Sequence, residues 1–343
     1  MFNLEKIVRI NILNLKPYAT ARDEFKGNDG IFFDANENPF GVLNRYPDPG
    51  QKALKKKLSE QRNVDSENIF IGNGSDEAID LAYRIFCEPG YDKALTFSPT
   101  YGMYDMAACI NNIELMKVPF NHMFQINREN LEKHINDPRL KLIFICSPNN
   151  PSGNVINDAD IEFILRNFKG LVFIDEAYIE FSDSPSWLGK ISLFANLLVS
   201  QTFSKAYGLA SARIGVAYSS PEIISLFNKV KPPYNVSLLN QEAALDALSN
   251  TLVFEANKKT ILREKKKLRA SLKKINMIKK IYPSDSNFLL VETTDANKTY
   301  DELVKRKIIT RNRHMCVENC IRITVGTPEE NRKLIAEFKK LAG

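Results

Sequence analysis

Six short runs, most of them nearly continuous in apolar residues, restrict the possible folds of this chain more than any other feature of its sequence. A strand that is apolar on both faces is typical of a parallel sheet covered by helices on both sides. Helical patterns alternate with these runs, as in residues 75–86, where the apolar side chains fall on one helical face. The alternation over residues 68–230 predicts an α/β fold with a mostly parallel central sheet. The runs are residues 68–74, 93–100, 113–120, 140–153, 170–178 and 196–205.

The remaining length predicts a second, smaller domain. The chain has 343 residues, enough for one large domain and a smaller one. Beyond residue 240, long helical patterns accompany two predicted strands at residues 286–293 and 321–326, which indicates an α+β unit. We expect an N-terminal arm and part of the small domain in residues 1–35, the large domain in residues 36–240, and the C-terminal small domain in residues 241–343.

Charge and composition exclude several classes of function. Much of the net charge of +6 lies in residues 256–281, whose apolar side chains fall near helical spacing. This pattern predicts an amphipathic helix with a solvated lysine face, and no nucleic-acid motif accompanies it. No segment approaches the roughly 18 apolar residues of a membrane span, and the N-terminus does not resemble a signal peptide.

The cysteines and histidines predict neither a disulfide framework nor a metal site. Five cysteines are few and odd in number, which fits reduced thiols in a cytoplasmic protein. The three histidines are far apart in the sequence, and Cys316 and Cys320 have no second pair of ligands. We therefore expect no bound metal.

A glycine-containing motif follows the first predicted strand. Ligands gather at the carboxyl ends of strands in open α/β sheets. In "GNGSDEAID", Gly72 and Gly74 permit a tight turn, and Ser75 is expected to cap a helix whose N-terminus attracts an anion. The motif is not a Walker loop, and Glu77 stands where a dinucleotide-binding motif has its third glycine. A simple strand–helix turn is the alternative interpretation.

Two further motifs bring polar side chains to predicted strand ends. Asp175 ends a buried apolar run, and a buried carboxylate costs free energy unless a cation or a donor meets it. A protonated pyridine nitrogen would serve, and a plain helix cap is the alternative. Tyr178 would reach the same ligand, whereas Glu176 is interpreted as supporting structure. Asn150 offers a side-chain amide in the turn-rich motif "CSPNNPSGN", unless that segment is a loop without function.

The fourth motif, "TFSKAYGLASARIG", places Lys205 among small and turn-forming residues. A lysine amine must be unprotonated to attack an aldehyde, and burial or a neighbouring cation lowers its pKa. Ser204 and Arg213 would bind a phosphate, and Arg213 would also be such a cation. Taken alone, Lys205 is equally compatible with an ordinary loop lysine.

In this order and spacing, the four motifs resemble fold-type I pyridoxal-phosphate aminotransferases, and the resemblance extends over nearly the whole chain. The segments "FDANENPFG", "NRYPDPG", "SPTYGMY", "KPPYNVS" and "IRITVGTPEEN" resemble the histidinol-phosphate aminotransferase branch. This implies pyridoxal 5'-phosphate as the cofactor and a small-molecule amino donor and 2-oxo acid as substrates. In histidine biosynthesis, L-histidinol phosphate and 2-oxoglutarate would give imidazole acetol phosphate and L-glutamate.

Other activities share these motifs. The alternatives are an aromatic amino-acid aminotransferase, a threonine-phosphate decarboxylase and, outside the enzymes, a pyridoxal-phosphate-binding regulatory module. Fold analogy alone does not separate the enzymatic alternatives.

The resemblance also implies roles around the cofactor. Lys205 would bind it covalently and move the substrate α-proton, and Asp175 would keep the pyridine nitrogen protonated. Tyr178 and Asn150 would donate hydrogen bonds to the ring oxygen, and Tyr101 would stack on the ring. The residues expected around the phosphate are Ser75 and Asp76 through their backbone amides, Ser204, Arg213 and, from the neighbouring subunit, Tyr46.

Substrate contacts follow from the same resemblance. Arg322 would bind a carboxylate or phosphate. Arg311 lies where a second anion-binding arginine is expected, with Arg313 as the competing candidate, and Tyr18 would close over the substrate. A site that includes Tyr46 of the other subunit implies an obligate homodimer with shared active sites.

Overall fold

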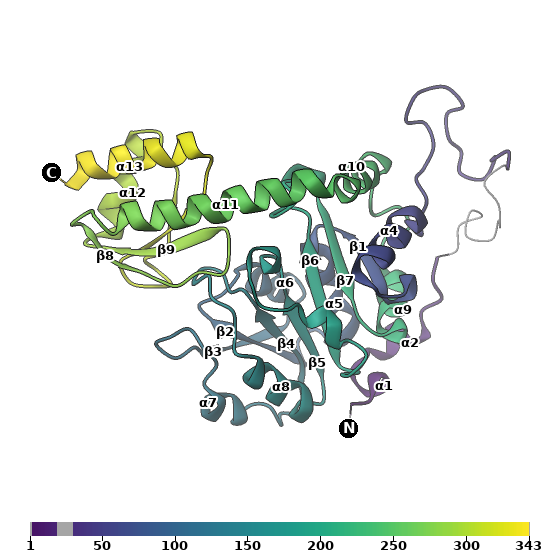
Figure 1. Ribbon diagram of the computed structural model, residues 1–343. Coiled ribbons are helices and arrows are strands. Elements are labelled where there is room, and N and C mark those ends of the chain that lie inside the picture. The colour runs from purple at the N-terminus through teal and green to yellow at the C-terminus, as the bar shows by residue number, and fades with distance from the viewer. Residues whose placement is uncertain (1, 19–29, 343) are drawn as a thin grey trace.

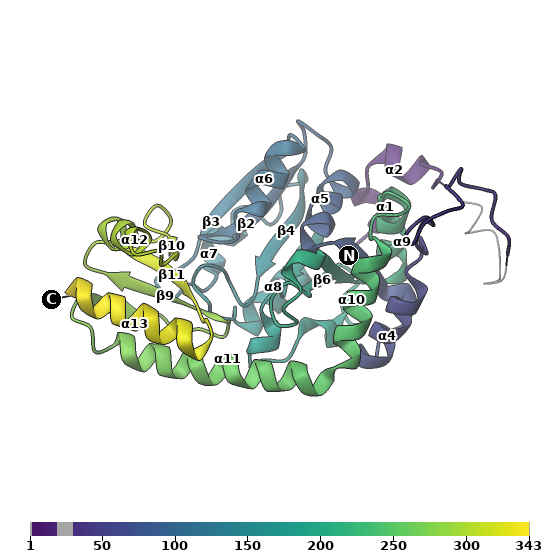
Figure 2. The same ribbon diagram turned by 90° about the horizontal axis from the view of Figure 1, so that it is seen from above.

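The chain forms two β-sheets joined by one long helix (Figure 1). This computed structural model describes residues 2–18 and 30–342, so residues 19–29 of the predicted N-terminal arm lie outside the described residues. Helix α11 (Thr251–Leu272) runs from the seven-stranded sheet to the four-stranded sheet (Figures 1 and 2). None of the described helices is long and apolar enough to cross a membrane.

The larger sheet has the order β1-β7-β6-β5-β4-β2-β3 and confirms the predicted mostly parallel α/β fold. Only β7 runs antiparallel to its neighbours, β1 and β6. The sequence analysis did not predict β7. Residues 203–213, which join β6 to β7, are too few for the crossover helix that parallel neighbours require. The strands are β1 (Ile69–Asn73), β2 (Lys93–Ser98), β3 (Glu114–Pro119), β4 (Leu140–Cys146), β5 (Leu171–Asp175), β6 (Leu197–Thr202) and β7 (Ile214–Tyr218).

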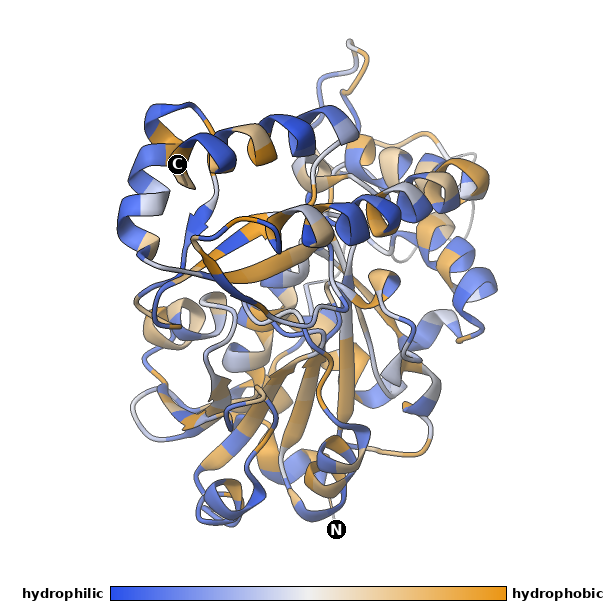
Figure 3. Ribbon diagram, turned by 60° about the vertical axis from the view of Figure 1, so that its left-hand side comes forward, coloured by the Kyte–Doolittle hydropathy of each residue, from blue (hydrophilic) through white to orange (hydrophobic). Residues whose placement is uncertain are grey.

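Helices cover both faces of this sheet because its central strands are apolar on both faces (Figure 3). Phe144 and Phe173 pack with α5 and α6 on one face, whereas Ile143 and Val172 pack with α8 on the other. Helices α4 and α10 cover the β1–β7 edge. The helices are α1 (Leu4–Ile7), α2 (Ile10–Asn14), α4 (Lys52–Arg62), α5 (Ser75–Phe86), α6 (Met103–Ile110), α7 (Arg128–Glu132), α8 (Asp158–Asn167), α9 (Pro221–Val230) and α10 (Leu238–Ser249), with short 3-10 helices η1 (Ser66–Asn68), η2 (Ile179–Phe181), η3 (Trp187–Lys190) and η4 (Ala210–Ala212).

The smaller sheet is antiparallel, with the order β10-β11-β9-β8. Helices α11, α12 (Ala296–Lys305) and α13 (Pro328–Ala342) bury its apolar side chains. The prediction of a helix through residue 281 was wrong, because α11 ends at Leu272 and pairing with β9 makes the last lysine-rich residues a strand. The strands are β8 (Ile278–Ile281), β9 (Phe288–Thr293), β10 (Arg311–Asn312) and β11 (Cys320–Thr324). We refer to these strands with α11–α13 as the small lobe.

An apolar cluster joins the small lobe to the larger sheet. Tyr178 and Phe181, which follow β5, pack with Phe288 at the start of β9, and Phe254 and Ile261 of α11 cover them. The edge-to-face contact of Tyr178 with Phe288 has a ring-centroid distance of 5.1 Å. This cluster brings β9 and β11 next to the carboxyl ends of the larger sheet. The predicted domain boundaries at residues 35 and 240 stay predictions.

Candidate active site

A cavity lies at the carboxyl edge of the larger sheet, where β4, β5 and β6 end. We call it the Lys205 cavity. It gathers nine of the residues that the sequence analysis singled out, although they come from six separate segments of the chain. They are Ser75, Asp76, Tyr101, Asn150, Asp175, Tyr178, Ser204, Lys205 and Arg213.

Asp175 provides a buried carboxylate in this cavity. It ends β5 and is only 2% exposed. Its Oδ2 accepts a hydrogen bond of 2.8 Å from the hydroxyl of Tyr104, and its Oδ1 accepts one of 3.1 Å from the backbone N–H of Ala177. Burial raises the pKa of Asp175 to about 6 despite these bonds. A cation in the cavity would therefore be strongly favoured.

The sequence analysis missed Tyr104, which supports this carboxylate from α6. Tyr104 is fully buried and stacks on Phe144 of β4 at a ring-centroid distance of 5.0 Å. The signal was present: a carboxylate that ends a buried strand needs a donor, and Tyr104 lies three residues after Tyr101 in the same motif. Cys146, Ala177 and Thr202 also line the cavity and were not singled out, whereas Ala210 is one of the small residues expected to leave room beside Lys205.

Glu176, interpreted as supporting structure, is buried but does not line the cavity. Its carboxylate accepts hydrogen bonds of 2.6 Å from the backbone N–H of Trp187 and of 3.0 Å from the amide of Gln201, and a further one from the hydroxyl of Ser186. Burial raises its pKa to about 7. These contacts attach η3 to β5 and β6.

The opposite end of the cavity is suited to an anion. Ser75 is the first residue of α5, and the expectation that it caps this helix was wrong, because Gly74 is the N-cap. Arg213 forms an ion pair of 3.2 Å with Asp76 and lies 3.4 Å from the hydroxyl of Ser204. Gly74 has a φ of +78°, and a Cβ there would lie 2.5 Å from the Arg213 guanidinium. The free N–H groups at the start of α5 and the guanidinium thus face the same space.

Lys205 follows β6 and brings an amine to the cavity. Its Nζ lies 5.9 Å from the ring centroid of Tyr178. Desolvation and the nearby Arg322 lower the pKa of Lys205, and Arg213 contributes in the same direction, whereas Asp76 and Asp175 oppose the shift. The amine is therefore more readily deprotonated than an ordinary lysine.

Asn150 connects the cavity to the small lobe. Its Oδ1 accepts a hydrogen bond of 2.6 Å from Nη1 of Arg322, and its Nδ2 lies 3.5 Å from the Tyr178 hydroxyl. Arg322 lies in β11, and its guanidinium carbon is 5.2 Å from the ring centroid of Phe288. A ligand in the cavity would thus meet groups from both sheets.

Three arginines gather where β10 meets β11. Arg311 lies directly opposite Arg322 in the antiparallel register, an arrangement that is normally destabilising. Arg313 continues the pairing through a backbone N–H bond of 2.9 Å to Cys320, so the alternation of the strand places it on the face of Arg311. The Nε atoms of Arg313 and Arg322 are buried without a hydrogen-bond partner among the described residues. Within the same residues no carboxylate forms an ion pair with any of the three.

Tyr46 and Tyr18 do not line the Lys205 cavity of their own chain. Tyr46 is half exposed and stacks on Tyr234 with a ring-centroid distance of 4.3 Å. Tyr18 is 77% exposed and lies in a separate hollow with Lys55 and Lys229.

The chemistry of the cavity fits a phosphorylated pyridine aldehyde. A buried carboxylate at Asp175 is suited to a pyridinium N–H, and the amine of Lys205 is suited to the aldehyde. The start of α5 with Arg213 is suited to the phosphate. The hydroxyl of Tyr178 and the amide of Asn150 remain for a ring oxygen.

Comparisons with known proteins identify close relatives. The family model described as aminotransferase class I and II matches residues 27–338. A histidinol-phosphate aminotransferase of Christiangramia forsetii is 53% identical, over 99% of this chain and 98% of the relative. The crystal structure of the histidinol-phosphate aminotransferase from Clostridium acetobutylicum superposes with a TM-score of 0.81 at 25% identity and covers 90% of this chain and 98% of that one. The enzyme from Sinorhizobium meliloti, solved in complex with pyridoxal-5'-phosphate, has a TM-score of 0.78 at 23% identity and covers 90% and 89% of the two chains.

Proposed function

The chain belongs to the class I and II aminotransferases, and within them to the histidinol-phosphate aminotransferases, and from this premise we propose how its residues bind the cofactor and the substrates. The reaction is the transamination between L-histidinol phosphate and 2-oxoglutarate in histidine biosynthesis, and pyridoxal 5'-phosphate is the cofactor. The aromatic aminotransferase and decarboxylase alternatives are therefore set aside. One observation carries the proposed site: Asn150 contacts both Tyr178, beside Lys205, and Arg322 of the small lobe.

Lys205 would hold the cofactor and move the proton. The bound cofactor supplies an aldehyde that accepts the amino group and a ring that accepts electron density when the α-proton leaves. Because desolvation and Arg322 lower its pKa, the Lys205 amine is suited to take the α-proton and to return it. The same amine would attach the cofactor between reactions.

The other cavity residues would hold the ring in place. Asp175 would keep the pyridine nitrogen protonated, and Tyr104 orients that carboxylate. Tyr178 and Asn150 would donate to the ring oxygen, and Tyr101 would stack on the ring. Ser75 and Asp76 through their backbone amides, with Ser204 and Arg213, would hold the phosphate. The charge of the Asp76 carboxylate does not oppose this role, because Arg213 neutralises it and Tyr101 donates to it at 3.1 Å.

The arginine cluster would select anionic substrates. Histidinol phosphate carries a phosphate and no carboxylate, whereas glutamate carries two carboxylates, so one pocket must accept both types of anion. Arg322 would bind the first anion, with its guanidinium oriented by Asn150. Arg311 would bind the second as its cross-strand neighbour, with Arg313 as the competing candidate on the same face. An incoming anion would relieve the repulsion among these cations.

Turnover of three amino donors side by side tests this assignment. Histidinol phosphate should have a higher kcat/KM than phenylalanine, and threonine phosphate should give no decarboxylation. A preference for phenylalanine would transfer the proposal to an aromatic aminotransferase, and release of CO₂ from threonine phosphate would transfer it to a lyase.

We further propose that the enzyme is a homodimer in which Tyr46 of one subunit reaches the cofactor phosphate of the other. Residues 30–46 form a loop that projects beyond the rest of the chain (Figure 1) and returns to it where Tyr46 stacks on Tyr234. The loop exposes large apolar side chains, including Phe33 at 93% and Val42 at 98%. Leu252, at the start of α11, is 87% exposed as well. A second subunit would bury such a surface. We propose that Tyr18, whose side chain is exposed, closes over the substrate.

Reduced thiols support a location in the cytoplasm. All five cysteines are free, and Cys87, Cys146 and Cys320 are buried. Such cysteine usage is typical of a reducing compartment.

A further inference from the structure

The turn that carries Asn150 is attached to the larger sheet on one side. It closes on itself through backbone bonds from Gly153 to Asn149, of 2.7 Å, and from Asn149 to Asn154, of 2.8 Å. The fully buried Asn149 side chain accepts from the Thr100 hydroxyl at 2.7 Å and donates to the Pro99 carbonyl at 3.0 Å. Asn149 therefore fixes the turn to the segment that precedes Tyr101.

A loop of the small lobe holds the other side of the same turn. The backbone N–H of Asp285 donates to the Gly153 carbonyl at 2.7 Å, and the Asp285 carboxylate accepts from the backbone N–H of Val155 at 3.1 Å. The turn and the loop pack so closely that a Cβ on Gly153, whose φ is +86°, would lie 2.8 Å from the Ser284 hydroxyl. One residue of the small lobe thus bonds to the turn through both its backbone and its side chain.

Helix α11 fixes the position of this loop. Lys265 donates to the backbone carbonyls of Ser284 at 2.9 Å and of Ser286 at 2.7 Å, on either side of Asp285. The hydroxyl of Ser284 also donates to the Phe288 carbonyl at 2.6 Å, at the first residue of β9. The loop is consequently tied to α11 and to the sheet that carries Arg322.

From these contacts we propose that Asp285 is a positioning residue, which sets the position of Asn150 between Tyr178 and Arg322 by linking the small lobe to the turn of residues 147–155. The inference rests on the proposed roles of Asn150 and Arg322 in binding the ring oxygen and the substrate anion. It adds a residue that touches neither ligand, lies more than a hundred positions from Asn150 in the sequence, and belongs to none of the four motifs.

The geometry around Asn150 is sensitive to such a link. Its amide serves two partners, and the 3.5 Å separation from the Tyr178 hydroxyl is already at the limit for a hydrogen bond. A displacement of the turn by about 1 Å would break that contact or release Arg322, and shifts of this size are enough to impair binding and catalysis. Free rotation of the small lobe would cause such a displacement, because Arg322 belongs to the small lobe and Asn150 does not.

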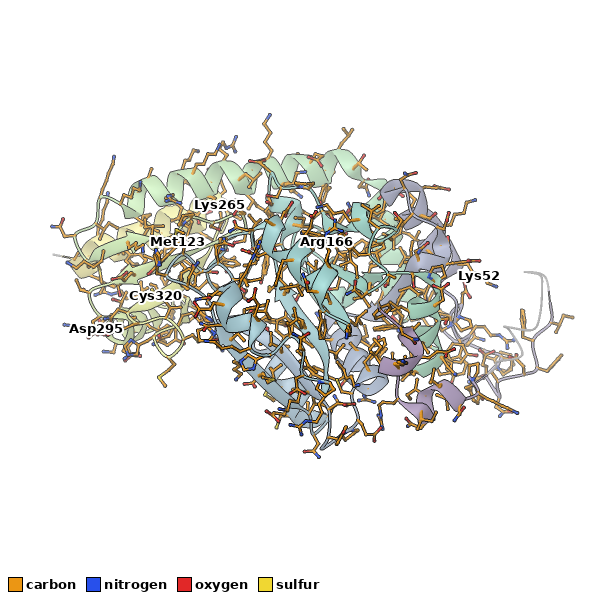
Figure 4. The ribbon with its side chains drawn as sticks, turned by 90° about the horizontal axis from the view of Figure 1, so that it is seen from below. Lys52, Met123, Arg166, Lys265, Asp295 and Cys320 are labelled. Carbon is orange, nitrogen blue, oxygen red and sulfur yellow. The ribbon has the colours of Figure 1, made fainter. Side chains whose placement is uncertain are left out.

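The test compares Asp285→Ala with Asp295→Ala in the full-length enzyme. Asp295 is a matched control because it is also an aspartate of the small lobe whose carboxylate accepts a backbone N–H, from Lys298 at 2.9 Å. It lies at the outer end of the lobe, whereas Lys265 of α11 lies closer to the larger sheet than Asp295 does (Figure 4). Asp285→Asn keeps a carbonyl acceptor for Val155 and is the conservative variant.

Two readouts separate positioning from a general loss of stability. In the cofactor-free protein, amide hydrogen exchange of residues 147–156 should become faster in Asp285→Ala and stay unchanged in Asp295→Ala. In the loaded enzyme, the KM values for histidinol phosphate and for 2-oxoglutarate should rise about tenfold in Asp285→Ala, the scale of one lost charge-assisted hydrogen bond, with a smaller change in kcat. Asp285→Asn should recover most of the loss.

Equal exchange and equal KM values in the two alanine variants would overturn the proposal. If Asp285→Ala does not fold, Lys265→Met is tested instead, because this substitution releases the loop from α11 while Asp285 is retained. Unchanged KM values in Lys265→Met would equally overturn the proposal. Failure of the proposed function would look different, since the unmodified enzyme would then not turn over histidinol phosphate, while the exchange experiment would still report on the link.

Discussion

Replacing Asp175 by asparagine should stabilise the cofactor-free protein at neutral pH, although the same change should disable the enzyme. Burial raises the pKa of this carboxyl from 3.8 to about 6, with the charge of Asp76 adding to the shift. Between these two pH values the folded protein holds a proton that the unfolded chain has released. The free energy of unfolding therefore falls as pH rises through this interval and stays lower above about pH 6.

The size of the effect follows from the width of the interval. One pKa unit corresponds to about 1.4 kcal/mol. Between about pH 4.5 and about pH 7.5, the free energy of unfolding of the unmodified protein should therefore fall by about 2 kcal/mol relative to that of Asp175→Asn. Asparagine also replaces one acceptor oxygen by a donor, which disturbs the bond from Tyr104 or from Ala177 and costs about 1 kcal/mol at every pH. The pH dependence of the difference is consequently a sharper test than its absolute value.

The assay is denaturant unfolding of the cofactor-free protein at both pH values, with Asp137→Asn as the control. The backbone N–H of Arg139 and, to a smaller extent, Lys93 lower the pKa of Asp137. The contribution of Asp137 to the free energy of unfolding therefore changes only below the pKa that it has in the unfolded chain. The control difference should stay constant between the two pH values. A constant difference for Asp175→Asn would refute the argument that burial raises the pKa of this carboxyl.

The other predictions concern the loaded enzyme. Lys205→Ala should bind the cofactor without the absorbance of its covalently attached form and should lose transamination; retention of both would contradict its role. Arg322→Met should move covalent cofactor capture to higher pH, because it removes a cation that lowers the pKa of Lys205, and an unchanged pH profile would count against this coupling. Arg311→Met should lose roughly 2–4 kcal/mol in kcat/KM for histidinol phosphate and much less for phenylalanine, whereas equal losses would direct the same measurement to Arg313. Mixed dimers of Lys205→Ala with Tyr46→Ala should regain part of the activity, and no recovery after proven subunit exchange would place each site within one chain.

The sequence predicts most strands of the larger sheet because the apolar residues within each strand are enough to identify it. A central strand such as β5 is apolar at nearly every position, since helices cover it on both faces. Two of the missed strands, β8 and β10, lack this property, whereas β7 was missed although it is buried at every position. β10 has only two residues, and β8 has two exposed lysines in its centre, so pairing with neighbouring strands rather than local composition makes them strands.

The candidate site was predictable to the extent that its residues follow strands. Parallel strands bring their carboxyl ends together, so Asn150, Asp175 and Lys205 had to be neighbours once the sheet was correct. No such rule covers Tyr104, which reaches Asp175 from a helix, or Asp285, which reaches the Asn150 turn from the small lobe. Tyr46 presents a different difficulty, because the site in which it is proposed to act belongs to the other subunit.

Unbalanced charges gather around the site, and this is itself an argument for function. Elsewhere Arg62 pairs with Glu180 and Arg128 with Asp160, whereas Arg311 faces Arg322 across two strands and the buried Asp175 forms no ion pair with the described residues. Each exception matches a charge that a reactant would bring: a pyridinium for the carboxylate and a phosphate or carboxylate for the arginines. Because Asp175 and the arginines each have a complement among the reactants, binding should raise the free energy of unfolding as well as start the reaction. The cofactor-free protein should therefore be the less stable form, most clearly above about pH 6, where Asp175 is ionised.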